Sequence, residues 1–216
     1  MITVDARNLS LKEVHQVLKL ERKGEQSFLD LLSLESLTTE EQHELENIRI
    51  SFNSYYAEGK ISEGQVKFLF LSPLLRLSGF YQPSIKITLE ENIADIFIED
   101  EDTLIKGRMD ILAVNKTPRT SPLFWILVIE AKNSSVEALE GLPQLLTYAY
   151  KSLDTQQSVW GLTTNGLRYQ FVYLQQGDTP TYQLLPELNL LDTERSLQLL
   201  QVSKAICKIQ HIPVLS

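Results

Sequence analysis

The sequence predicts an α/β fold of the α+β kind, in which a mixed β-sheet is flanked by helices. In the N-terminal third, apolar residues recur at spacings of three and four, which is typical of amphipathic helices. Further along, the period changes to two, because Ile85, Ile87 and Leu89 alternate with polar residues. Residues 123–129 are an unbroken apolar run, typical of a strand buried on both faces. With 216 residues and 43% hydrophobic content, the chain can form one globular unit with a substantial core.

The first part of the chain is expected to be helical. Thr39-Glu40-Glu41-Gln42 fits a capping box, in which two side chains satisfy backbone N–H groups at the start of a helix. Apolar residues then follow on one helical face: Leu45, Ile48, Phe52 and Tyr55. We therefore expect residues 10–58 to be helical. We expect two parts, a helical N-terminal extension, residues 1–58, and a core domain, residues 59–216. The extension should pack on the core domain.

A second helix is predicted directly after this extension. Ser62-Glu63-Gly64-Gln65 can cap it, and Glu63 is then an acid in the first turn, where the helix dipole favours negative charge. Pro73 should kink this helix, and Gly79 should end it.

The middle of the chain is expected to form strands joined by one helix. Extended segments are predicted at residues 93–98 and 104–114, separated by a polar turn, and the apolar strand should end at Lys132. A helix over residues 136–152 would follow. The order strand, helix, strand predicts a crossover between parallel strands. Four residues of this helix should face inward: Leu139, Leu142, Leu146 and Ala149.

The C-terminal part is expected to form a hairpin and a last helix. Asn165-Gly166 tolerates the positive φ angles of a tight turn, so it should join strands at residues 158–163 and 167–174. The last amphipathic helix should begin after Asp192 and run to about Ile209.

Charged residues at the end of the apolar strand indicate a functional site. Glu130 and Lys132 are two apart, so their side chains leave the same face of a strand. Charge in a dry sheet is costly unless it is paired or binds a metal. The chain has one cysteine, Cys207, and three scattered histidines, which offer no Cys/His metal site. Any metal would therefore be a hard ion with oxygen ligands.

Two strings on this chain resemble the PD-(D/E)xK nuclease superfamily, and two more resemble particular members of it. Gly107-Arg108-Met109-Asp110 has a methionine in place of the proline, and Ile129-Glu130-Ala131-Lys132 matches the second half of the motif. Gln144-Leu145-Leu146-Thr147-Tyr148 and Thr164-Asn165-Gly166 resemble more narrowly the N-terminal nuclease domain of type I restriction enzyme R subunits and RecB-like nucleases. The resemblance covers about residues 60–175 and implies a restriction-endonuclease-like fold.

This resemblance implies a Mg²⁺-dependent nuclease that hydrolyses DNA phosphodiester bonds, in which Mn²⁺ can substitute. The implied metal ligands are Asp110, Glu130, the Ala131 carbonyl and Glu63. The implied catalytic residues are Asp110, Glu130, Lys132, Gln144 and Tyr148. Lys132 would orient the attacking water or neutralise developing charge, and Arg108 and Tyr148 would contact the nucleic acid, with Lys106 beside them.

Each of these residues taken alone has a simpler explanation. An aspartate such as Asp110 is often a turn or cap residue, and an E-x-K string is often a weak surface ion pair. Glu63 is explained by its place at a helix N-terminus. Cations such as Lys106 and Arg108 are common on strand edges. The nuclease interpretation depends on these residues occurring together, in order, on the expected elements.

The charge of the chain argues against a nucleic-acid substrate. Lysine and arginine number 20 against 28 acidic residues, so the net charge is −8. The local field at a site counts for more than net charge. The first alternative is therefore a catalytically silent nuclease-fold protein that binds nucleic acid or a protein partner. The second is an enzyme acting on RNA, for which the sequence has no RNA-binding motif.

Partners and location follow only in outline from the sequence. No G-x-x-x-x-G-K-[ST] string occurs, so no ATP site is expected, unlike a full R subunit. No apolar run approaches the roughly 20 residues that span a bilayer, and the N-terminus does not resemble a signal peptide. We therefore expect a cytoplasmic protein without membrane contact. It could be a homodimer or a restriction-system subunit, or its helices could simply cover the sheet.

Overall fold

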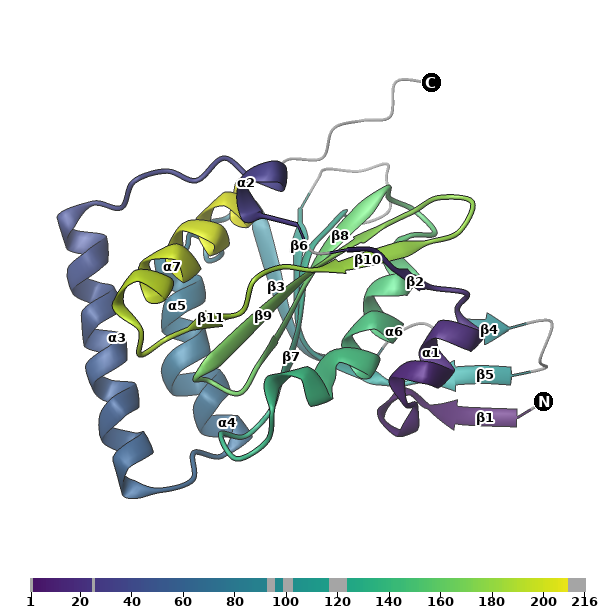
Figure 1. The fold of residues 1–216 in the computed structure, drawn as a ribbon, viewed down its shortest axis with the longest axis horizontal. Coiled ribbons are helices and arrows are strands. Elements are labelled where there is room, and N and C mark those ends of the chain that lie inside the picture. Colours follow the sequence, from purple (N-terminus) through teal and green to yellow (C-terminus); the bar gives the residue numbers. More distant parts are fainter. Residues whose placement is uncertain (1, 25, 93–95, 99–102, 117–123, 210–216) are drawn as a thin grey trace.

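The computed structural model describes residues 2–24, 26–92, 96–98, 103–116 and 124–209 (Figure 1). In this part of the chain, a mostly antiparallel eight-stranded sheet is flanked by helices on both faces, which confirms the α+β fold class. The strand order is β2-β10-β9-β8-β7-β6-β3, and β11 pairs with β9. The strands are β2 (Glu21–Arg22), β3 (Ile85–Asn92), β6 (Arg108–Asn115), β7 (Phe124–Ala131), β8 (Ser158–Thr164), β9 (Arg168–Gln175), β10 (Thr181–Leu184) and β11 (Leu188–Asn189).

Helices cover the two faces of this sheet in two groups (Figure 1). Helices α3, α5 and α7 pack together on one face, and α6 and α1 pack on the other. Strand β6 is buried on both sides, because Ile111 packs into the first layer and Leu112 into the second. The helices are α1 (Leu11–Val17), α2 (Phe28–Leu31), α3 (Thr39–Glu58), α4 (Glu63–Gln65), α5 (Ser72–Leu77), α6 (Leu142–Ser152) and α7 (Thr193–Cys207). No helix in the described ranges is both long and apolar enough to cross a membrane.

The N-terminal region is only partly helical, so the prediction of helix throughout residues 10–58 is wrong. Strand β2 joins the edge of the main sheet by pairing parallel with β10. Strand β1 (Ile2–Asp5) belongs to a second, three-stranded sheet. The N-terminal region therefore contributes to both sheets as well as covering the core. Short strands such as these carry too few residues for a periodic pattern.

The capping box of α3 lies one residue earlier than predicted. Thr38, not Thr39, is the N-cap, and its side chain accepts a hydrogen bond from the Glu41 backbone N–H. The Glu41 carboxylate in turn accepts from the Thr38 backbone N–H. Of the predicted apolar face, Tyr55 remains 41% exposed, although its ring contacts Phe70 edge-on. The other three members are buried: Leu45, Ile48 and Phe52.

The helix predicted after Ser62 begins as expected but changes pitch. Ser62 caps α4 through Gln65. A π-helical segment, Val66–Leu71, then leads into α5, in which Pro73 occupies the first turn. Proline has no backbone N–H, so a wider turn just before it fits its missing hydrogen bond. Gly79 ends the helix with a φ of +93°, as predicted.

The strand predicted over residues 104–114 is divided at Gly107. Strand β5 (Thr103–Lys106) lies in the three-stranded sheet, between β1 and β4 (Ile96–Ile98). Strand β6 begins directly after Gly107 and belongs to the main sheet. The predicted extended stretch 93–98 is seen only as β4, since residues 93–95 lie outside the described residues.

The crossover from β7 to β8 is confirmed, because these strands pair parallel and α6 lies between them in sequence. Helix α6 starts later than predicted. A 3₁₀ turn, Ala138–Gly141, precedes it, and Leu139 is 42% exposed instead of inward. Pro143 is in the first turn of α6, a position that suits proline. The other three predicted inward residues are buried: Leu142, Leu146 and Ala149.

The hairpin and the last helix are confirmed. Strands β8 and β9 pair antiparallel, and Gly166 between them has a φ of +88°. Helix α7 begins after Asp192, whose side chain accepts a hydrogen bond from the Arg195 backbone N–H. The sequence does not predict strands β10 and β11, because both are short.

Candidate active site

A cavity lies where β6 begins and β7 ends. These strands are antiparallel with Ile111 opposite Ile129, so Asp110 and Glu130, one step further, are neighbours at this end. The cavity has a volume of about 670 Å³. Six residues predicted from the sequence line it: Glu63, Arg108, Asp110, Glu130, Lys132 and Gln144. Its other lining residues in the described structure are Asp5, Arg7, Asn92, Lys106 and Gly107.

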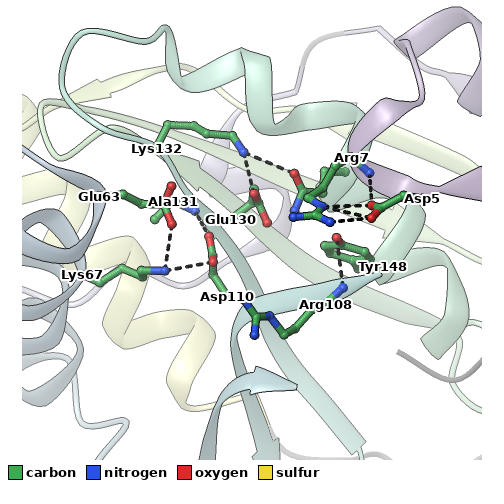
Figure 2. A network of polar contacts seen from close by, with 11 residues as sticks. Asp5, Arg7, Glu63, Lys67, Arg108, Asp110, Glu130, Ala131, Lys132 and Tyr148 are labelled. Atoms are coloured by element: carbon green, nitrogen blue, oxygen red, sulfur yellow. Dashed lines mark hydrogen bonds and ion pairs between the residues drawn. The ribbon is translucent and has the colours of Figure 1, made fainter. Parts of the chain in front are cut away.

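Both carboxylate oxygens of Asp110 accept hydrogen bonds from the protein itself. Oδ2 accepts from the Ala131 backbone N–H at 2.8 Å, and Oδ1 accepts from Lys67 Nζ at 3.0 Å. Lys67 Nζ also donates to Glu63 Oε1 at 2.9 Å. Burial lowers the pKa of Lys67, but its hydrogen bonds to the two carboxylates outweigh this effect and hold the pKa above its ordinary value. Lys67 is therefore an ammonium that joins a carboxylate of α4 to one of β6 (Figure 2).

Glu130 is the most buried carboxylate of the cavity. Its side chain is 2% exposed, and Oε1 accepts a hydrogen bond from Lys132 Nζ at 2.7 Å. The other oxygen, Oε2, is buried and has no hydrogen-bond partner among the described residues. Burial, and then the nearby charge of Asp110, raise the pKa of Glu130 to about 8, and Lys132 offsets only part of this rise. Lys132 alone therefore does not compensate the cost of burying this charge.

Helix α6 contacts the Glu130–Lys132 pair through Gln144. Lys132 Nζ donates a second hydrogen bond to Gln144 Oε1 at 3.2 Å, and Gln144 is itself buried. The helix approaches closely because residue 141 has no side chain. A Cβ added to Gly141 would lie 2.9 Å from Glu130 Cγ.

Tyr148 lies behind the cavity wall, so the structure gives it a positioning contact. Its side chain is fully buried, and its hydroxyl oxygen accepts a hydrogen bond from the Arg108 backbone N–H at 3.3 Å. Burial and the charge of Glu130 raise the pKa of Tyr148 to about 12, so the hydroxyl stays neutral. The side chain of Arg108 instead lines the cavity and forms an exposed ion pair with Glu90 at 3.0 Å.

Arg7 enters the cavity from the N-terminal part of the chain, on the opposite side from Lys67 (Figure 2). Its guanidinium donates two parallel hydrogen bonds to Asp5, from Nε to Oδ1 at 3.0 Å and from Nη2 to Oδ2 at 2.6 Å. These side-chain hydrogen bonds hold the pKa of Asp5 below its ordinary value. Asp5 pairs in register with Lys106, because β1 runs parallel to β5. Arg7, Lys106 and Arg108 therefore share one rim of the cavity.

Sequence reasoning missed Lys67, Arg7 and Asp5 as site residues. Lys67 follows Glu63 by four positions, a spacing at which helical side chains meet, and this spacing was a visible indication. Arg7 and Asp5 had no such indication. Their place depends on the pairing of β1 with β5, which links residues far apart in sequence.

The cavity offers a small set of oxygen ligands for a magnesium ion. Within the described ranges, no group of three or more His, Cys, Asp or Glu side chains is arranged to hold a metal ion. Mg²⁺ needs fewer protein ligands, since it keeps several waters and binds through one or two carboxylates. Asp110 and Glu130 are two such carboxylates, and the unpartnered Glu130 Oε2 is a buried oxygen that a cation would satisfy. The Ala131 carbonyl leaves the same strand edge as the N–H that bonds Asp110. These three residues fit a magnesium ion.

Comparison with known proteins does not identify a family, because no protein-family model and no curated protein matches this sequence.

Proposed function

We propose that this protein is a Mg²⁺-dependent nuclease that hydrolyses DNA phosphodiester bonds, with Mn²⁺ able to substitute. One observation carries the proposal. Two carboxylates from neighbouring antiparallel strands, Asp110 and Glu130, share a cavity with Lys132, which donates to Glu130 at 2.7 Å. Two carboxylates and an ammonium at the open end of a sheet supply metal ligands and a proton-bearing cation side by side.

The residues of the cavity divide the work of hydrolysis. Asp110, Glu130 and the Ala131 carbonyl would hold the ion, which supplies an activated water and neutralises charge on the phosphate. Lys132 reaches the same space and can stabilise negative charge on a phosphoryl oxygen as a compact ammonium. Gln144 fixes the direction of Lys132 by accepting its second hydrogen bond at 3.2 Å. Tyr148 supports the start of β6 from behind.

A rim of cations would bind the DNA backbone beside the cleaved bond. Arg7, Lys106 and Arg108 line the cavity together. Asp5 engages two nitrogens of Arg7, and guanidinium groups have five N–H donors, so Arg7 keeps donors for a phosphate. The net charge of −8 is unfavourable for DNA at long range. Arg7 is paired with Asp5 and Arg108 with Glu90, so phosphate binding would depend on Lys106 and on the remaining guanidinium donors.

The test is cleavage of supercoiled plasmid, linear duplex and single-stranded DNA with Mg²⁺ or Mn²⁺. We expect cleavage by the wild type and loss of cleavage in Asp110→Asn and Lys132→Met. Lys86→Met is the matched control, because Lys86 is an exposed lysine of β3 outside the cavity. Cleavage that survives both site variants, or that is absent from the wild type, would contradict the proposal.

The same samples separate cleavage from binding alone. A nuclease-fold protein that only binds would retain DNA in a gel-shift experiment after Asp110→Asn and would never cut. The hydrogen bonds that occupy both oxygens of Asp110 are the observation that favours this second candidate. If the protein cuts RNA in preference to DNA, the substrate in the proposal changes to RNA, but phosphodiester hydrolysis remains the reaction.

A further inference from the structure

Lys67 occupies the place where a cation would meet Asp110. Its Nζ lies 3.0 Å from Asp110 Oδ1 and 2.9 Å from Glu63 Oε1, and its side chain is 20% exposed. The second oxygen of Asp110 accepts from the Ala131 backbone N–H at 2.8 Å. An ion that binds Asp110 through Oδ1 would therefore share or take the oxygen that Lys67 now contacts.

The charges of the cavity show why an internal cation belongs there. Glu63, Asp110 and Glu130 bring three carboxylates to one wall, and Lys67 and Lys132 each contact at least one of them. Neighbouring carboxylates repel one another unless a cation lies between them. Lys67 supplies that cation for Glu63 and Asp110. A divalent ion beside the same oxygen would repel the ammonium, so the two cations compete.

We propose that Lys67 is a built-in counter-cation of the metal site, which leaves Asp110 when a divalent ion binds and thereby sets the affinity for that ion. The proposal rests on the proposed metal-dependent function. Glu63 makes the exchange feasible. It lies four residues before Lys67 on the same helical stretch, so the displaced ammonium keeps a partner and is not left as an unpaired charge.

This assignment changes the role expected for Glu63. The resemblance of the motifs to PD-(D/E)xK nucleases implied that Glu63 binds the metal, but one oxygen of its carboxylate is already paired with Lys67. In the exchange it is a positioning residue that receives the ammonium. Asp110 and Glu130 then remain as the two side-chain ligands.

The test is the affinity for Mn²⁺, followed by electron paramagnetic resonance, together with calorimetric titration of Ca²⁺. The variant Lys67→Met removes the ammonium and keeps the length of the side chain. We expect it to bind both ions more tightly than the wild type, by about tenfold or more, because one competing charge has been removed. Lys67→Arg keeps the charge and should remain close to the wild type. Lys86→Met is the control, because Lys86 is an exposed residue at the start of β3, which lies opposite Val114 and away from the cavity.

A second variant protects the test from misfolding. Lys67→Gln is neutral and keeps a polar side chain with two N–H donors, so it should fold and should also bind Mn²⁺ more tightly. Unchanged or weaker binding in both neutral variants would overturn the role of Lys67. If the wild type binds Mn²⁺ and Asp110→Asn does not, the proposed metal-dependent function stands even when the role of Lys67 is overturned.

Other outcomes are also decisive. If neither the wild type nor the neutral variants bind an ion, both this proposal and the proposed function fail. If only the neutral variants bind, Lys67 competes strongly enough to keep the metal out. That result overturns the exchange, because Lys67 then never leaves Asp110 in the wild type, and cleavage by the same variants reports on the proposed function separately.

Discussion

The ring of Tyr148 lies directly against the backbone of Gly107. A Cβ added at residue 107 would come within 2.5 Å of Tyr148 Cε1 and 2.8 Å of its hydroxyl oxygen. Gly107 is also the point at which the chain leaves the three-stranded sheet and enters the main sheet. The close contact places the tyrosine hydroxyl where it accepts from the Arg108 backbone N–H, two residues before Asp110. The position of the first carboxylate is therefore linked to α6 through this glycine.

Gly107→Ala should both destabilise the protein and misplace the start of β6. The added methyl group overpacks a buried ring, which typically costs about 1–3 kcal/mol. Urea unfolding would measure this cost. In the cleavage assay, Gly107→Ala should lose more activity than the control variant Gly24→Ala. Gly177→Ala is less suited as a control, because its Cβ would meet the Thr179 carbonyl oxygen at 3.2 Å. Gly24→Ala is the matched control, since nothing lies within 4 Å of its Cβ position.

A double variant tests whether the tyrosine ring is the cause. In Tyr148→Leu the hydroxyl and the aromatic ring are absent, so adding Gly107→Ala should cost much less than it does in the wild type. Equal costs in the two backgrounds would show that the strain at residue 107 has another origin.

Glu130→Gln should stabilise the protein in the absence of divalent ions, and the gain should grow with pH. Burial, with the charge of Asp110, raises the folded-state pKa of Glu130 to about 8, above the value of 4.5 expected when the chain is unfolded. Between these two values the unfolded carboxyl is ionised while the folded one keeps its proton, so wild-type stability falls as pH rises. Above pH 8 the penalty is complete and constant. Glutamine has no such proton to lose.

The measurement is the difference in melting temperature between Glu130→Gln and the wild type in chelator, from about pH 5 to about pH 9. The difference should rise in favour of the variant up to about pH 8 and then level off. Glu140→Gln, at an exposed position of the neighbouring 3₁₀ turn, is the control for general effects of removing a carboxylate. A difference that stays flat, or that falls with pH, would contradict the prediction.

The sequence predicted the part of the fold that depends on local patterns. The apolar run of β7, the Asn165-Gly166 turn and the cap of α7 each lie within a few neighbouring residues, and all three are confirmed. The sequence does not predict strands β1 and β2, because their extended conformation depends on pairing with β5 and β10, which lie about 100 or more positions away. Local propensity carries little information about such pairings.

The candidate site follows the same division. Asp110, Glu130, Lys132 and Gln144 were predicted from their strings, and the structure brings them to one cavity. Lys67 could have been found from its spacing to Glu63, but its contact with Asp110 depends on how the π-helical segment Val66–Leu71 lies against β6. Nothing in the strings distinguishes a carboxylate that is free for a metal from one that an internal ammonium already holds.

Arg7→Ala should weaken DNA binding without destabilising the fold. Arg7 lines the cavity, and its ion pair with Asp5 is largely exposed, since 67% of the arginine side chain remains accessible. Exposed pairs of this kind contribute little to stability, so the melting temperature should remain close to that of the wild type. Losing one phosphate contact should weaken binding to all DNA sequences alike. It should also reduce the slope of log affinity against log salt concentration by about one.

Binding is best measured with the Asp110→Asn variant as the background, so that the DNA stays intact, in a series of salt concentrations. Arg22→Ala is the matched control, because Arg22 is an exposed arginine of β2 outside the cavity. Arg7→Lys separates charge from geometry. Lysine keeps the charge but lacks the planar fork that binds Asp5 and a phosphate together, so we expect it to recover only part of the affinity. If Arg7→Ala and Arg22→Ala change the salt slope equally, the rim is not a specific phosphate site, and DNA contacts this protein through its general surface charge.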